Sequence, residues 1–302
     1  MELADGREVM AKPRGRLEIV QARAEKDWLK EDKLVFAHHV SVGDQVVLSE
    51  PEAEQPVIEE LKPRETWLLR RSGGRYRRRP QCVVANADQL AVVVAPNPEV
   101  RLNVVDRYFL AAIQGGLEPM LVVNKIDLDP KLPESLQLTA YRDQGYGVFF
   151  TAALNGQGLP QLAERLAGKL TAFCGHSGVG KSTILSALTG VKLKTLEVRP
   201  DTLKGRQATE TSRIYHLPGG GLVVDTPGVR EFGLIHLTWL DVHEYFADIA
   251  TLAQECAYRD CTHTVEPECA VQRAVKAGQL AAARLLSFQK LRKESEVGKY
   301  EL

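Results

Sequence analysis

Short apolar runs alternate with helix-length segments through the middle of this 302-residue chain. Five such runs occur, at residues 90–95, 119–124, 147–150, 171–175 and 221–225. Nearly continuous apolar strands between helices are typical of a parallel sheet that is buried on both faces. The pattern therefore predicts a largely parallel α/β domain that begins near residue 82.

The two ends of the chain carry different patterns. Short β-like runs separated by turn signals predict a small all-β module at the N-terminal end. The stretch RRSGGRYRRRP, residues 70–80, predicts a basic linker after it. Beyond residue 239 we expect helices around a Cys/His-rich loop, including one helix over about residues 270–294. The predicted domains are residues 1–75, 76–239 and 240–302.

Net charge gives no indication of a nucleic-acid partner, because Lys plus Arg and Asp plus Glu number 39 each. Any RNA-binding surface must therefore come from local clusters of basic residues. The sequence has neither a run of eighteen apolar residues nor the apolar stretch of a signal peptide. We expect a cytoplasmic monomer with no membrane partner.

A phosphate-binding loop is predicted where GHSGVGKST follows an apolar run and precedes a helical segment. Its glycines let backbone N–H groups point at phosphates, and the next helix presents its positive end. Lys181 would reach the β- and γ-phosphates, and Ser182 would be a Mg²⁺ ligand. The expected nucleotide contacts here are Gly175, His176, Ser177, Gly178, Val179, Gly180, Lys181, Ser182 and Thr183.

The motif NKID indicates which base the nucleotide carries. The Asp127 carboxylate can accept two hydrogen bonds from guanine, whereas adenine offers no matching pair of donors. Asn124 would connect this loop to the phosphate loop, and the Lys125 stem would cover the base. The nearby segment FFTAAL fits a loop whose backbone, at Thr151 and Ala152, touches the guanine oxygen. GTP is therefore the expected nucleotide.

Two polar segments complete the predicted site. In DTPG, Asp225 can hold a Mg²⁺-bound water, and the Gly228 N–H can sense the γ-phosphate. In GRQATETS, Thr209 could ligate Mg²⁺ when the γ-phosphate is present, which makes this the natural switch segment.

The order of the motifs is reversed relative to ordinary GTPases, in which the phosphate loop precedes the guanine motif. Here NKID comes first, so the domain is predicted to be circularly permuted. Permutation is tolerated when the original chain ends lie close together on the surface. It also places DTPG next to the C-terminal domain, so that the nucleotide state could move that domain.

Four candidate metal ligands lie within fourteen residues, at Cys256, Cys261, His263 and Cys269. Three thiolates and one imidazole suit tetrahedral Zn²⁺. Because the protein supplies all four ligands, we expect one structural zinc rather than a catalytic one. Cys82 and Cys174 fall in or beside apolar runs and are expected to be buried.

Together these motifs resemble the RsgA (YjeQ) family of small-ribosomal-subunit-dependent GTPases. The resemblance covers about residues 40–295 and rests on ANADQLAVVVA, DRYFLAA, NKIDL, GHSGVGKSTILSAL, DTPGVREFGL and the Cys/His cluster. It implies an N-terminal OB barrel, a permuted GTPase domain and a C-terminal zinc domain. The implied role is late maturation of the small ribosomal subunit, with that subunit and its rRNA as partners.

The sequence departs from this family at two places. The family's switch reads G-R-H-T-T-T, whereas this chain keeps Thr209 and has Gln207 where the family's water-orienting histidine stands. Glutamine orients water in other GTPases, so Lys181, Gln207 and Thr209 are the catalytic candidates, with slow hydrolysis expected without a partner. The first barrel strand is expected to be missing or short.

Two questions stay open at this stage. The chain could instead be a GTP-binding RNA-docking module with little hydrolytic activity, or a GTPase that chaperones a different RNA or a metalloprotein. Two basic clusters could contact RNA phosphates, or could simply be solvated surface. They comprise Arg70, Arg71, Arg75, Tyr76, Arg77, Arg78 and Arg79 in the linker, and Arg273, Lys276, Arg284, Lys290, Arg292 and Lys293 near the C-terminus.

Overall fold

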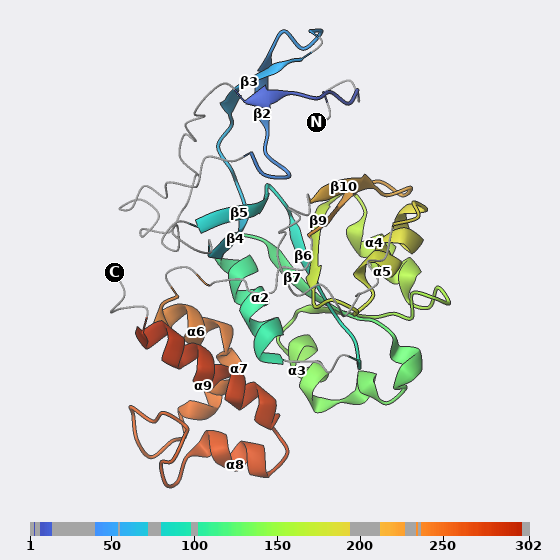
Figure 1. The fold of residues 1–302 in the computed structure, drawn as a ribbon. Helices are drawn as coiled ribbons and strands as arrows, with labels where there is room; N and C mark the ends of the chain where they lie inside the picture. Colours follow the sequence, from blue (N-terminus) through green and yellow to red (C-terminus); the bar gives the residue numbers. More distant parts are fainter. Residues whose placement is uncertain are drawn as a thin grey trace, which may run out of the picture.

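The computed structural model describes residues 3, 7–13, 40–53, 55–71, 80–97, 102–193, 212–226, 234 and 237–297. These residues form a small N-terminal sheet, a central α/β unit and a group of C-terminal helices. The small sheet and the C-terminal helices lie at opposite ends of the molecule (Figure 1). No helix in the described ranges is long and apolar enough to cross a membrane.

The N-terminal sheet has three strands in the order β1-β3-β2. They are β1 (Lys12–Pro13), β2 (Val46–Ser49) and β3 (Val57–Leu61). β1 pairs parallel to β3 and β2 pairs antiparallel to it, around a small core that contains Ile58 and Leu61. The predicted OB barrel is not confirmed, because three short strands do not close a barrel and residues 14–39 lie outside the described ranges.

A two-stranded antiparallel ribbon joins this sheet to the central unit. Its strands are β4 (Trp67–Arg71) and β5 (Pro80–Ala85). The Ala85 N–H donates to the Val42 carbonyl at 2.8 Å, which holds the start of the described segment 40–53 against the ribbon. The predicted basic linker falls mainly on residues 72–79, outside the described ranges.

The central sheet has six strands in the order β10-β11-β9-β6-β7-β8. They are β6 (Gln89–Val94), β7 (Glu118–Val123), β8 (Gly147–Phe150), β9 (Leu170–Gly175), β10 (Arg213–His216) and β11 (Leu222–Asp225). All neighbours pair parallel except β10, which lies antiparallel at the edge. The predicted parallel α/β domain is confirmed.

Helices cover both faces of this sheet. They are α2 (Leu102–Gln114), α3 (Leu136–Asp143), α4 (Leu159–Leu166) and α5 (Lys181–Thr189). Successive side chains of a strand point to opposite faces. Accordingly, Leu90 and Val92 of β6 join the core that includes α2, whereas Ala91 and Val93 join the core that includes α4 and α5. This explains why the strand is apolar from Leu90 to Val94.

The C-terminal region contains α6 (Trp239–Tyr245), α7 (Ala247–Ala253), α8 (Ala270–Lys276) and α9 (Ala282–Val297). Thr238 and Asp241 form a capping box that starts α6. The prediction of a single helix over about residues 270–294 is wrong, because the chain turns between α8 and α9. Gly278 has a φ of +72° in that turn, a left-handed conformation that favours glycine and ends helices.

The C-terminal helices pack on the same side of the sheet as α2. Phe246 and Phe288 are buried in the core that also contains Phe109 of α2. α9 runs beside α2 in Figure 1, and Arg107 of α2 donates two hydrogen bonds to Glu294 of α9. The central unit and the C-terminal helices therefore share one hydrophobic core.

Candidate nucleotide site and metal cluster

The predicted nucleotide motifs follow four strands of the central sheet, β7, β8, β9 and β11, and β6 lies between β9 and β7. Val123 of β7 is paired with Val94 of β6 and with Phe150 of β8, and Gly175 of β9 is paired with Val93. Asp225 ends β11 opposite Phe173 of β9. The carboxyl ends of parallel strands meet at one edge, which is where open α/β sheets bind ligands. The permuted chain order therefore still brings all four loops together.

The phosphate loop connects β9 to α5 through backbone conformations that need glycine. Gly175 has a φ of +143° and Gly180 a φ of +94°. A Cβ at Gly175 would lie 2.2 Å from the Val93 carbonyl oxygen, and one at Gly180 would lie 2.3 Å from Asn124 Nδ2. Both positions therefore exclude a side chain on grounds of space as well as φ.

Side chains of this loop remain accessible to a ligand. His176, Ser177 and Gly178 are exposed, and Val179 is buried beneath them. Lys181, Ser182 and Thr183 are half-buried and form the first turn of α5, where the unpaired N–H groups and helix dipole favour anions. The Lys181 ammonium donates to the Gly175 carbonyl at 2.8 Å, so that the cation already lies over the loop.

Asn124 joins the guanine-motif loop to the phosphate loop. Its side chain is only 2% exposed. Its Nδ2 donates to the Val179 carbonyl at 3.0 Å. Its Oδ1 accepts from the Thr151 hydroxyl and from the Ala153 N–H, both at 3.1 Å. One buried amide therefore holds three loops of the candidate site in register.

Lys125 and Asp127 lie in the loop that is expected to contact guanine. Lys125 adopts a left-handed φ of +60°, and its Nζ donates to the Gly178 carbonyl at 2.6 Å. The exposed Asp127 lies in a 3₁₀ helix, Ile126–Leu128, and no hydrogen bond engages its carboxylate within the described part of the chain. The Ile126 N–H donates to the Thr151 carbonyl at 3.2 Å, which places the buried Ala152 backbone beside this loop.

The structure describes only part of the segments predicted to bind Mg²⁺ and to sense the γ-phosphate. Asp225 is half-buried, and the Thr226 hydroxyl donates to the Phe173 carbonyl at 2.5 Å, which fixes the end of β11 against the phosphate-loop strand. The sequence patterns had not indicated this threonine contact, although Thr226 is part of DTPG. Gln207, Thr209 and Gly228 fall outside the described residues.

The predicted metal ligands converge in the C-terminal region. The ligand atoms of Cys256, Cys261, His263 and Cys269 all lie within 4.8 Å of one another. Tetrahedral coordination with Zn–S bonds of about 2.3 Å would place two sulfur atoms roughly 3.8 Å apart. Cys256 Sγ lies 3.9 Å from Cys269 Sγ, and His263 Nδ1 lies 3.4 Å from Cys269 Sγ. The cluster could therefore hold one metal ion.

Helix α9 and a carboxylate hold the metal-binding loop. Gln289 Nε2 donates to the His263 carbonyl at 2.7 Å, and Arg292 Nη1 donates to the Cys261 carbonyl at 3.1 Å. The Glu266 carboxylate accepts from the Thr262 hydroxyl and from nearby backbone N–H groups, which lower the pKa of Glu266 to about 2. These contacts support the ligands from outside, as metal sites commonly require.

Cys82, Cys174 and Arg284 are buried, whereas Arg292 is half-buried. Cys82 and Cys174 are buried, as expected, and burial raises the pKa of Cys82 to about 11 and that of Cys174 further. Arg284 is 1% exposed and paired with Asp106, so its assignment to an RNA-facing helix surface is wrong. Arg292 packs over Trp239 in addition to bonding the metal loop.

Comparisons with known proteins agree with this geometry. Residues 61–235 match the family described as RsgA GTPase. The "Small ribosomal subunit biogenesis GTPase RsgA" of Chlorobaculum tepidum is 39% identical over 258 residues, which covers 82% of this chain and 83% of that protein. The protein of the same name from Ectopseudomonas mendocina is 39% identical over 251 residues, covering 82% and 72% respectively.

Solved structures show the same architecture. YjeQ from Thermotoga maritima superposes with a TM-score of 0.64 and 29% identity, over 97% of this chain and 92% of that one. YloQ, a circularly permuted GTPase, superposes with a TM-score of 0.58 and 26% identity, over 86% and 82%. The predicted permutation is confirmed, and the chain belongs to the RsgA GTPase family.

Proposed function

We propose that this chain hydrolyses GTP as a switch in late maturation of the small ribosomal subunit, and that it binds the rRNA of that subunit. The observation that carries the nucleotide part is the Asn124 amide, which joins the guanine-motif loop to the phosphate loop. The printed names of the relatives, which refer to small-subunit biogenesis, support the ribosomal part.

The nucleotide would lie along the carboxyl edge of the sheet. Asp127 would accept from the guanine N1–H and amino group, and the backbone at Thr151 and Ala152 would face the guanine oxygen. The backbone of the phosphate loop would bind the phosphates, with Lys181 leaving the Gly175 carbonyl to reach the β- and γ-phosphates. Adenine offers the Asp127 carboxylate no matching pair of donors, which favours GTP over ATP.

Ser182 and Thr209 would ligate the Mg²⁺ that accompanies GTP, and Asp225 would hold a water bound to that ion. When bound, this ion neutralises charge on the phosphates during transfer. Gln207 would orient the attacking water, and Gly228 would sense the γ-phosphate. Asp225 ends β11, and the next residue, Thr226, donates to the Phe173 carbonyl of β9, so this end of the strand is held in place. Hydrolysis would release the switch segment and the DTPG loop, and thereby the bound subunit.

The metal cluster would hold one structural Zn²⁺. Its three thiolates and imidazole suit zinc, and four protein ligands leave no coordination position for water. We assign residues 1–75 to an OB-like module, 76–239 to the GTPase domain and 240–302 to the zinc domain. For a protein that acts on assembling ribosomal subunits, we propose a cytoplasmic location, and we propose that the chain is a monomer.

The test is GTP hydrolysis by the purified chain at low salt, alone and with added small subunits, with Lys181→Ala as the blank. Strong stimulation by small subunits is the expected result. GTP binding without stimulated hydrolysis would support the alternative, an RNA-docking module, and would direct attention to Gln207. Equal stimulation by large subunits would refute the small-subunit assignment.

A further inference from the structure

A buried ion pair lies where the central unit meets the C-terminal helices. Asp106 of α2 is fully buried, and Arg284 of α9 is 1% exposed. The Asp106 Oδ1 atom accepts from Arg284 Nη1 at 2.7 Å and from the hydroxyls of Tyr141 at 2.8 Å and Tyr245 at 2.6 Å. Buried charges are costly unless they are paired and hydrogen-bonded, so this cluster fixes one arrangement of the helices.

Arg284 also reaches across the junction to α3. Its Nη2 donates to Gln144 Oε1 at 2.6 Å, and its Nε donates to Asp248 Oδ2 at 3.1 Å. The guanidinium stacks over Phe246, 4.1 Å from the ring centroid. Burial alone would lower the pKa of Arg284, but Asp106, Tyr245 and Asp248 together raise it above its ordinary value. The cation therefore stays charged and tied to several elements.

Helix α3 connects the two loops that would contact guanine. The chain passes from Asp127 through a second 3₁₀ helix, Leu132–Glu134, into α3. It leaves α3 at Gln144 and enters β8, which ends next to Thr151. A displacement of the C-terminal end of α3 is therefore transmitted along the chain in both directions to the candidate base site.

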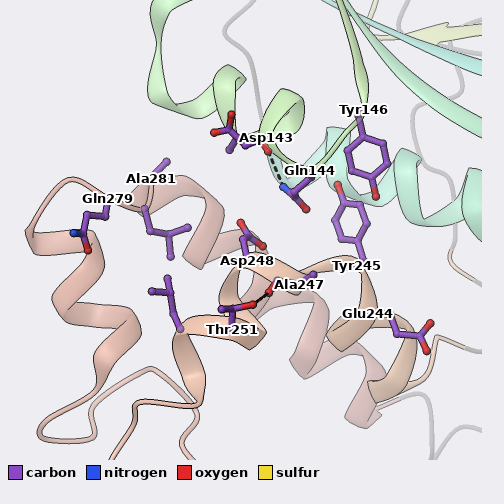
Figure 2. Close-up of a pocket in the computed structure, with 13 residues that line it drawn as sticks. Asp143, Gln144, Tyr146, Glu244, Tyr245, Ala247, Asp248, Thr251, Gln279 and Ala281 are labelled. Atoms are coloured by element: carbon purple, nitrogen blue, oxygen red, sulfur yellow. Dashed lines mark hydrogen bonds between the residues drawn. The ribbon is translucent and has the colours of Figure 1, made fainter.

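The junction has space for such a displacement. A cavity of about 430 Å³ separates the end of α3 from α7 and from the turn before α9. Gln144 and Tyr146 lie on one side of it, and Tyr245 and Asp248 lie on the other (Figure 2). Because packed interiors resist movement and cavities permit it, α3 can shift here without overlapping a neighbour. Arg284 hydrogen-bonds Gln144 and Asp248, which line this cavity from opposite sides.

We propose that Arg284 and Gln144 are positioning residues for the guanine site, so that the placement of the C-terminal helices sets the affinity for nucleotide and its rate of release. This inference rests on the proposed function, because it assumes that guanine binds between Asp127 and Thr151. A partner that moves the C-terminal helices would change GDP release through this contact.

The test is Gln144→Ala in the full, metal-loaded chain. The change removes the acceptor on α3 but leaves Arg284 paired with Asp106. We expect GDP release to accelerate about fivefold and the KM for GTP to rise by a similar factor, with kcat at saturating GTP unchanged. Gln144→Glu, which keeps an acceptor oxygen for Arg284, should restore most of the affinity.

Arg107→Ala is the matched control. It breaks the pair between Arg107 and Glu294, which also joins the central unit to α9 but does not involve α3. GDP release and KM should stay at the wild-type values in this variant. A second variant, Tyr141→Phe, removes only the hydroxyl by which α3 bonds Asp106 and should accelerate GDP release in the same direction.

Two results would overturn the inference. One is wild-type GDP release and KM in both Gln144→Ala and Tyr141→Phe. The other is an equal change in Arg107→Ala, since that would indicate general loosening of the junction rather than an effect through α3. Failure of the wild-type chain to bind GTP would instead refute the proposed function. Titrating the wild-type protein with GTP before the variants are measured separates this outcome from the other two.

Discussion

Replacing Asn124 with alanine should separate the guanine-motif loop from the phosphate loop. The change removes three hydrogen bonds of a side chain that is 2% exposed. It also leaves the Val179 carbonyl and the Ala153 N–H without these partners. At a net contribution of about 1 kcal/mol for each bond, within about half a kcal/mol either way, the three bonds give a loss of roughly 2–4 kcal/mol.

Most of this loss should appear in nucleotide binding, because the bonds join loops of the site rather than elements of the core. At about 1.4 kcal/mol for each factor of ten, GDP affinity should fall roughly 30- to 1000-fold. Fluorescent-GDP titration measures the affinity, and thermal unfolding of the free protein measures the part of the loss that reaches global stability.

Asn155→Ala provides the matched control. Asn155 is exposed in the loop that follows Ala153, and its Oδ1 accepts only a local bond from the Gln157 N–H at 3.0 Å. This variant should bind GDP like the wild type. If Asn124→Ala also binds GDP within threefold of the wild type, the loops are held together by other contacts and the reasoning is wrong.

Three further predictions follow from the two sites. Gly180→Ala should reduce GDP affinity at least tenfold in the same titration, because its Cβ would lie 2.3 Å from Asn124 Nδ2 at a φ of +94°. Asp127→Asn should favour xanthine over guanine nucleotides, since the xanthine carbonyl can accept from the new amide; unchanged GTP affinity would contradict the base-reading role. Chelation should expose the three cluster thiols to a thiol-reactive dye while Cys82 and Cys174 stay slow at neutral pH and react faster as pH rises, because their raised pKa keeps the thiolate scarce.

The central domain could be predicted from sequence because its physical signals are local. A strand buried on both faces must be apolar at every position, as β6 is from Leu90 to Val94. Residues 175 and 180 are glycines because a Cβ there would lie too close to the Val93 carbonyl and to the Asn124 side chain. Such constraints act on single positions, so one sequence reveals them.

The wrong predictions concern residues whose surroundings are set by contacts with distant parts of the chain. Arg284 lies in a Lys- and Arg-rich segment, which is typical of a solvated helix face, yet its partner Asp106 is 178 residues earlier in the chain. Nothing local distinguishes a cation that faces water from one that faces a buried carboxylate. Likewise, the Ala-rich composition between residues 270 and 294 favoured one helix, while the turn at Gly278 is needed so that α9 can lie along α2.

The permutation gives the C-terminal helices access to both ends of the nucleotide site. Among the described residues, β11 is the last strand and α6 is the next element, so the candidate phosphate end precedes these helices in the chain. Arg284 joins the same helices to α3 and thus to the base end through hydrogen bonds. In the unpermuted order, the chain would leave the domain after the guanine loops, and the phosphate end would lack this connection. On the proposed function, a partner that binds the C-terminal helices would act on the base end and on the γ-phosphate end together, which is the coupling that a ribosome-stimulated hydrolase requires.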